Sequence, residues 1–255
     1  MSKRINFDLT DKVIMVTGAG KGIGKSIALV CAEMGADLVL GSRTVAESEQ
    51  TAEECRALGR KAEAWPLDVR EVSSIRGFVD KALAAFDQID VLVNNAGYNV
   101  PKPAIDYTEE DFDAIADTNF KGAFFCATMV AKSMIEREVQ GTIINISSQV
   151  GHVGGPLRSI YAGAKGGVNQ LTRSLAAEWA ANGITVNGVS PTFTRTPMLE
   201  AALKNPDFRK NLDKVPLGRV AEPEEIAAAV VYLAGDAARI VTGHTILVDG
   251  GFTAV

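Results

Sequence analysis

Tyr161 and Lys165 are the residues of this chain whose types and spacing first suggest chemistry. Apolar residues recur at helical spacing from Val168 to Trp179, so one long helix is predicted here. Residues four apart lie on one face of such a helix, with Cβ atoms roughly 5–6 Å apart. A phenol titrates near ~10, and a neighbouring ammonium lowers that pKa by roughly 1–3 units. Tyr161 is therefore a candidate general acid/base for a reaction at a carbonyl, although such pairs also occur on ordinary helices.

Two further motifs stand at the ends of apolar runs that predict buried strands. Ser147 and Ser148 end the run over 141–147, and on a strand their side chains would point to opposite faces. A turn with the spacing G-x-x-x-G-x-G follows the run over 13–17. Glycines in a strand-to-helix turn let backbone N–H groups approach a pyrophosphate, although such a turn is also a plain structural device.

The chain alternates between strand and helix patterns throughout. Strands are predicted over 13–17, 37–41, 61–67, 90–94, 141–147, 185–189 and 246–248, with helical stretches between them. This alternation predicts an α/β fold: a Rossmann-type, doubly wound sheet of seven parallel strands with helices on both faces. We expect residues 1–255 to form a single domain, in which the irregular stretch over 191–220 is a candidate substrate lid.

Composition narrows the class of protein. Apolar residues make up 47% and charged residues 22%, which is typical of a globular protein. A net charge of -5 argues against nucleic acid as a partner, and no apolar run is long enough to span a membrane. The start, residues 1–8, is too short and polar for a signal peptide, and three scattered cysteines suit the reducing cytoplasm. With His152 and His244 as its only histidines, the chain is expected to hold no metal.

Taken together with Asn-Asn-Ala-Gly over 94–97, these motifs resemble the short-chain dehydrogenase/reductase family from Lys12 to Gly251. The resemblance implies an enzyme that transfers a hydride between a nicotinamide cofactor and a carbonyl or secondary alcohol. It also implies a homotetramer, packed in part through the last strand and turn. The catalytic residues that it implies are Asn119, within a predicted helix over 109–137, Ser148, Tyr161 and Lys165.

The same resemblance implies where a dinucleotide would bind. Arg43 ends the second strand where NAD-specific sites place an acid, and Lys21 lies in the glycine turn, so NADP is favoured over NAD. Near the nicotinamide, Thr192 stands where most relatives have glycine. The predicted cofactor-binding residues are Gly18, Lys21, Gly22, Ile23, Gly24, Arg43, Asp68, Val69, Asn95, Thr194 and Thr196, together with Tyr161 and Lys165.

The loop between Ser148 and Tyr161 bears on the substrate, because both of its ends carry catalytic candidates. Gln149, His152 and Arg158 suit a small polyhydroxylated or carboxylated molecule, so a sugar or a sugar acid such as gluconate is one candidate substrate. We expect these three residues to recognise it together with Ser148 and Tyr161. The alternative is that His152 and Arg158 face solvent at the tip of this loop.

Two other functions stay open from the sequence. One is a 3-oxoacyl-[acyl-carrier-protein] reductase. Such enzymes usually carry bases where this chain has Val139 and Asn182, although Arg137 and Arg173 are nearby. The other is a non-catalytic, nucleotide-binding redox sensor, a class that could tolerate loss of the catalytic residues retained here.

Overall fold

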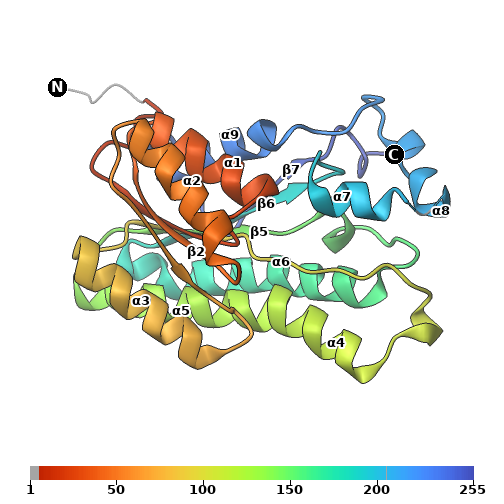
Figure 1. The fold of residues 1–255 in the computed structure, drawn as a ribbon, viewed down its shortest axis with the longest axis horizontal. Coiled ribbons are helices and arrows are strands. Elements are labelled where there is room, and N and C mark those ends of the chain that lie inside the picture. Colours follow the sequence, from red (N-terminus) through yellow and green to blue (C-terminus); the bar gives the residue numbers. More distant parts are fainter. Residues whose placement is uncertain (1–5, 205) are drawn as a thin grey trace.

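A computed structural model describes residues 6–204 and 206–255. Seven strands form one parallel sheet in the order β3-β2-β1-β4-β5-β6-β7, with helices on both faces (Figure 1). The predicted Rossmann-type sheet is therefore confirmed. The strands are β1 Val13–Thr17, β2 Asp37–Ser42, β3 Ala62–Pro66, β4 Val91–Asn94, β5 Thr142–Ile146, β6 Thr185–Pro191 and β7 Thr245–Val248.

Two helical layers enclose the sheet. Helices α1 Gly22–Glu33, α2 Val45–Ala57 and α9 Pro223–Ala234 lie on one side, and α3 Val72–Phe86, α5 Gly122–Glu136 and α6 Ser159–Trp179 lie on the other (Figure 1). The shorter helical segments are η1 Ala104–Asp106, α4 Glu109–Ala116, η2 Asp117–Lys121, η3 Gln149–Gly151, η4 Ala180–Asn182, α7 Pro197–Ala202, α8 Pro206–Arg209, η5 Leu212–Lys214 and η6 Asp236–Ala238. Within the described residues, no helix is long and apolar enough to cross a membrane.

The central strands β1, β4 and β5 are buried along their whole length and largely apolar, because helices cover both faces of the sheet, whereas the edge strands β3 and β7 are only partly buried. In β1, Ile14 and Val16 pack into the core under α1 and α9, whereas Val13 and Met15 pack into the core under α3, α5 and α6. This alternation follows from the two-residue period of a strand. It fixes which residues at the strand ends face which helical layer.

Several strand ends differ from the prediction by one or two residues, and three other differences bear on the site. The helix predicted over 109–137 is interrupted by η2, a π-helical segment, because an extra residue is accommodated between α4 and α5. The stretch over 191–220, predicted to be irregular, contains α7 and α8, while Asn205 lies outside the described residues. Strand β5 ends at Ile146, so Ser147 and Ser148 follow the strand rather than belong to it.

The sheet also determines where a ligand can bind. Strands β2 and β4 lie on opposite sides of β1, so the chain reverses its direction of winding at that point. In open α/β sheets ligands bind in the crevice beyond the carboxyl ends of the strands at this switch point. The glycine turn after β1 and Asn95 after β4 both stand there.

Candidate active site

One cleft of about 360 Å³ lies at the carboxyl ends of the strands. It brings together residues from the turns after β1, β2, β4 and β5, from the start of α6, and from the segment after β6. Predicted site residues that line it are Gly18, Lys21, Gly22, Ile23, Gly24, Arg43, Asp68, Val69, Asn95, Ser148, Gln149, Arg158, Tyr161, Lys165, Thr194 and Thr196.

Lys165 is buried, and its environment is unusual for an ammonium group. Its Nζ donates a hydrogen bond to the carbonyl of Ile146 at 2.7 Å and lies 5.6 Å from the centre of the Tyr161 ring. Burial lowers the pKa of Lys165 from 10.5 to about 8. The end of β5 and the first turns of α6 are thus joined through this one side chain.

Tyr161 differs from the prediction in its electrostatics. Burial raises the pKa of Tyr161, and hydrogen bonding with the Ser148 hydroxyl and the positive charge of Arg158 oppose that rise. The sequence predicted Lys165 as the group that lowers this pKa. That prediction is wrong for this structure, in which Arg158 is the cation that lowers it and the Lys165 ammonium is directed to the Ile146 carbonyl.

The two serines after β5 have different partners. Ser147 is buried and its hydroxyl donates to the carbonyl of Lys165 at 3.1 Å, so it ties β5 to α6. Ser148 precedes η3, where its hydroxyl accepts from the backbone N–H of Val150 at 3.4 Å. The Ser148 hydroxyl also hydrogen-bonds with Tyr161, whereas Ser147 connects two elements of the fold.

Asn119 lies in η2, behind the cleft rather than among its lining residues. Its Nδ2 donates to the carbonyls of Tyr98 at 2.6 Å and Ile115 at 2.8 Å. A Cβ on Gly97 would come 3.2 Å from the Asn119 Oδ1 and 3.9 Å from the Lys165 Nζ, so Gly97 allows these two side chains to approach each other. A π-helical turn at this point is typical of functional sites.

The glycine turn has the open backbone that a dinucleotide requires. Gly18 and Gly22 have φ values of 69° and 57°, in the left-handed region that favours glycine. A Cβ on Gly24 would come 2.2 Å from the carbonyl oxygen of Gly18. Asn95 fixes the turn by donating to that carbonyl, and Lys21 provides no side-chain cap to the N-terminus of α1. The N–H groups of this helix end fit a pyrophosphate.

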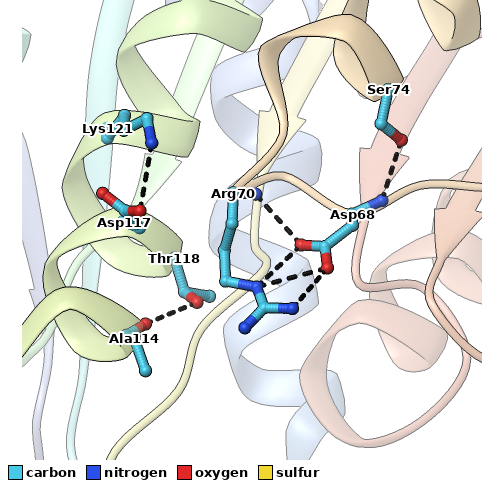
Figure 2. Close-up of polar contacts among 7 residues, drawn as sticks. All are labelled: Asp68, Arg70, Ser74, Ala114, Asp117, Thr118 and Lys121. Carbon is cyan, nitrogen blue, oxygen red and sulfur yellow. Dashed lines mark hydrogen bonds and ion pairs between the residues drawn. The ribbon is translucent and has the colours of Figure 1, made fainter. Parts of the chain in front are cut away.

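At the end of β2 and β3, three charged residues adjoin the cleft. Arg43 is exposed, and within the described residues its side chain has no ion pair. Asp68 is held by Arg70, whose guanidinium reaches it at 2.6 Å and whose backbone N–H donates at 3.0 Å (Figure 2). The Arg70 hydrogen bonds and, to a smaller extent, the Arg43 charge lower the pKa of Asp68.

Figure 2 places Arg70 between Asp68 and the η2 segment, where Asp117 pairs with Lys121 at 3.0 Å. Arg70 thus orients the Asp68 carboxylate, a role that the sequence analysis did not assign. The sequence did contain a signal for this role, because Arg70 follows Asp68 by two residues in the same loop.

Of the five predicted substrate residues, the three that lie inside the loop between Ser148 and Tyr161 have different locations. Arg158 is 6% exposed, with its guanidinium carbon 5.7 Å from the centre of the Phe193 ring. Gln149 is buried as well. His152 is not among the cleft residues, because η3 turns it back toward β6 and α6, where it contacts Ser190 at 2.9 Å and Asn169 at 3.1 Å. The predicted substrate contact of His152 is therefore not found.

Three buried acceptor atoms of the cleft have no hydrogen-bond partner in the described part of the chain. They are the side-chain oxygens of Gln149, Asn99 and Thr192. Buried polar atoms are nearly always paired, so such atoms in a cleft fit hydrogen-bonding groups of a ligand. Asn99 was not predicted, since a single asparagine in a loop carries no recognisable spacing. Across residues 6–204 and 206–255, no cluster of His, Cys, Asp or Glu could hold a metal ion.

Comparison with known proteins agrees with this site. A family model described as enoyl-(acyl carrier protein) reductase matches residues 18–253. The chain is 38% identical over 245 residues to 3-oxoacyl-[acyl-carrier-protein] reductase FabG of Thermotoga maritima, covering 95% of this chain and 98% of the relative. It is 37% identical over 250 residues to 2-dehydro-3-deoxy-D-gluconate 5-dehydrogenase of Escherichia coli, covering 97% and 98%.

One of the similar solved structures contains a bound nucleotide. An Agrobacterium tumefaciens protein assigned as a 2-deoxy-D-gluconate 3-dehydrogenase, with bound NADP, superposes with a TM-score of 0.90. The two are 34% identical, and the match covers 98% of this chain and 99% of that one. The chain therefore belongs to the short-chain dehydrogenase/reductase family and is a nicotinamide-dependent oxidoreductase that acts on CH–OH groups.

Proposed function

We propose that the protein is an NADP-dependent oxidoreductase that interconverts a secondary alcohol and a ketone on a sugar or sugar acid. The proposed substrate class rests on the polar groups that line the cleft. Arg158 supplies a buried positive charge for a carboxylate, and the unpaired oxygen of Gln149 can accept from a hydroxyl. Apolar side chains, among them Phe193, Met198 and Leu199, also line the cleft, so the proposed substrate class rests on Arg158 and Gln149.

A bound nicotinamide supplies the hydride for reduction and accepts it in oxidation. In reduction, Tyr161 gives its phenolic proton to the substrate oxygen as the hydride reaches the carbonyl carbon, so a C=O group becomes CH–OH. Ser148 donates a hydrogen bond to that oxygen while negative charge develops on it. Lys165 binds the nicotinamide ribose, and Asn119 behind it supports a water that relays protons to Lys165.

The preference for NADP rests on Lys21 and Arg43. Both are exposed cations that border the cleft where the ribose of a dinucleotide binds, and a guanidinium suits a 2′-phosphate. The NADP held by the Agrobacterium tumefaciens protein supports the same choice. Gly18, Gly22, Ile23, Gly24 and Asn95 would hold the pyrophosphate, Asp68 and Val69 the adenine, and Thr194 and Thr196 the nicotinamide.

The test of the substrate class is a screen with the purified enzyme. Keto-sugar acids, sugars and acetoacetyl thioesters are compared as substrates for wild type and Arg158→Ala. Sugar acids should give the highest kcat/KM, and Arg158→Ala should lower it at least about tenfold, as loss of a charge-assisted hydrogen bond implies. Neutral sugars serve as the matched control, because they lack the carboxylate. Reduction of thioesters alone, unchanged in Arg158→Ala, would contradict the proposal.

That last outcome would favour the acyl-carrier-protein reductase, which the FabG-named relatives support. Of the two bases near the expected carrier surface, Arg137 pairs with Asp87 at 3.1 Å and Arg173 donates to Gln170 at 3.2 Å. The redox-sensor alternative is not retained, because the chain is a member of an oxidoreductase family.

We further propose that the enzyme is a homotetramer and acts in the cytoplasm. Its three cysteines are all buried as free thiols, which suits a reducing compartment. The segment over 191–220 supplies Thr192, Phe193, Met198 and Leu199 to the cleft, and we propose that it closes over the substrate.

A further inference from the structure

An ion pair crosses the entrance to the proposed dinucleotide site. Lys21 Nζ lies 3.1 Å from Glu47 Oε1 and joins the residue before α1 to the first turn of α2. Both residues line the cleft beside Arg43. Neither the glycine motif nor the end of β2 accounts for Glu47, which the sequence analysis did not identify.

The glycine turn is shaped to bring Glu47 close. A Cβ on Gly20 would come 2.7 Å from the Glu47 Cβ and 3.2 Å from its Oε2. Gly20 thus lets the Glu47 side chain lie directly against the turn. Thr51 strengthens this contact, because its hydroxyl donates to the carbonyl of Ala19 at 3.1 Å and fixes α2 against the turn.

The charge of Glu47 acts differently on the two nicotinamide nucleotides. A 2′-phosphate beside Arg43 and Lys21 must compete with the Glu47 carboxylate for the Lys21 ammonium, and the two anions repel each other. A 2′-hydroxyl carries no charge, leaves the Lys21–Glu47 pair intact and can donate a hydrogen bond to a carboxylate.

We propose that Glu47 is a specificity-determining residue that opposes Lys21 and Arg43, so that the site accepts NAD as well as NADP. The inference rests on the proposed dinucleotide site, and it limits the NADP preference that the two cations alone would produce. Removing the charge of Glu47 should make the enzyme more strictly NADP-dependent.

The experiment measures the Kd of NADPH and of NADH by isothermal titration calorimetry, without substrate, in wild type and in Glu47→Gln. The matched control is Glu54→Gln. Glu54 pairs with Lys25 at 2.7 Å between the same two helices but does not line the cleft. Thermal unfolding midpoints of all three proteins show whether the loss of either ion pair alters the fold.

The Kd of NADPH should fall about two- to fivefold in Glu47→Gln, in keeping with release of one exposed ion pair. The Kd of NADH should rise about twofold, because an amide oxygen is a weaker acceptor than a carboxylate. Glu54→Gln should leave both values unchanged. The inference is overturned if the ratio of the two Kd values stays as in wild type, or if Glu54→Gln shifts it equally.

The two proposals fail separately in this experiment. A wild type that binds NADH more tightly than NADPH would contradict the proposed NADP preference, yet a shift toward NADPH in Glu47→Gln would still support the role of Glu47. Failure of wild type to bind either nucleotide would overturn both.

Discussion

At the scale of single residues, burial shifts the pKa values of Tyr161 and Lys165, both in α6, in opposite directions. It raises the pKa of the Tyr161 phenol and lowers that of the Lys165 ammonium to about 8, so both groups are driven toward their neutral forms. The Ser148 hydroxyl and the Arg158 charge favour the phenolate of Tyr161. Two neighbours from the same loop thus prepare the phenol for proton transfer before a cofactor is bound.

Replacing Tyr161 by Phe tests this role directly. Turnover should fall by about 10²–10⁴, because a positioned general acid/base is lost. The nucleotide Kd should remain close to that of wild type, since the phenol oxygen contributes little to pyrophosphate binding. Steady-state kinetics and calorimetry measure the two effects. Near-normal turnover with a good substrate would assign the proton transfer to another group.

We expect Lys165 to be required for activity, but burial of its ammonium group should lower the free energy of unfolding of the cofactor-free protein. Its pKa falls from 10.5 to about 8, which corresponds to about 3 kcal/mol of burial cost. Lys165→Met removes this cost and also the hydrogen bond to Ile146, worth about 1.5–3 kcal/mol. We therefore expect Lys165→Met to be inactive and to raise the free energy of unfolding at pH 7 by about 1 kcal/mol, measured by urea denaturation.

The pH dependence of the free energy of unfolding tests whether burial of the Lys165 ammonium causes this difference. Below pH 8 folded Lys165 is charged and the full cost is present. Between about 8 and 10.5 the unfolded state binds more protons than the folded state, so wild type gains stability as the pH rises. The advantage of Lys165→Met should therefore shrink over this range. Lys132→Met, at a side chain that is 75% exposed, is the control and should show no such trend.

At the scale of elements, the break between α4 and α5 is supported by one side chain. The Asn119 Nδ2 joins this segment to the loop after β4, because it donates to the carbonyl of Tyr98 in that loop and to the carbonyl of Ile115 in α4. Asn119→Ala would remove two hydrogen bonds made by a side chain that is 1% exposed, so the free energy of unfolding should fall by about 2–4 kcal/mol. Differential scanning calorimetry should record a midpoint lower by about 5–10 °C.

Asn182 provides the comparison for this substitution. It is exposed in η4, and Asn182→Ala should change stability by less than about 0.5 kcal/mol. If Asn119→Ala were as harmless as Asn182→Ala, the π-helical turn would be stabilised by packing rather than by these hydrogen bonds.

The same elements show what the sequence could and could not predict. All seven strands were predicted from short apolar runs, which are typical of a sheet covered on both faces, and the long helix α6 was predicted from apolar residues at helical spacing. The π-helical turn at Asn119 did not, since α-helix and π-helix share nearly the same side-chain pattern. Helices α7 and α8 are only 6 and 4 residues long, too short for periodicity to reveal.

In the cleft, motif residues were predictable because their spacing along one element is fixed. Glu47 was not, because its contact with Lys21 on another element appears only in the folded chain. Asn99 has no recognisable spacing, and the nearness of Arg70 to Asp68 in the sequence did not by itself assign a role to Arg70. His152 shows the reverse case, in which a residue expected in the cleft does not line it. Its loop begins and ends at the cleft, but η3 directs the imidazole away from it.

At the scale of the whole molecule, two apolar surfaces bear on the proposed homotetramer. One is a groove of about 460 Å³ on the outer side of α4, η2 and α6, in which Phe112 is 54% and Phe120 is 40% exposed. The other is the edge of the sheet at β7, where Leu247 is 41% exposed. Exposed apolar patches of this kind mark association sites. Two different two-fold interfaces on one chain generate a closed tetramer.

The groove also adjoins the candidate active site, because Ile160, Gly163 and Ala164 line it from the helix that carries Tyr161 and Lys165. A second copy that binds there would contact the start of α6.

We expect wild type to be a tetramer by light scattering coupled to size exclusion. Phe120→Glu should yield dimers, because a buried carboxylate in the groove is unfavourable. Ile105→Glu, at a residue that is 94% exposed outside the groove, should remain tetrameric. A monomeric wild type at micromolar concentration would contradict the proposed assembly, and a tetrameric Phe120→Glu would exclude this groove as one of its interfaces.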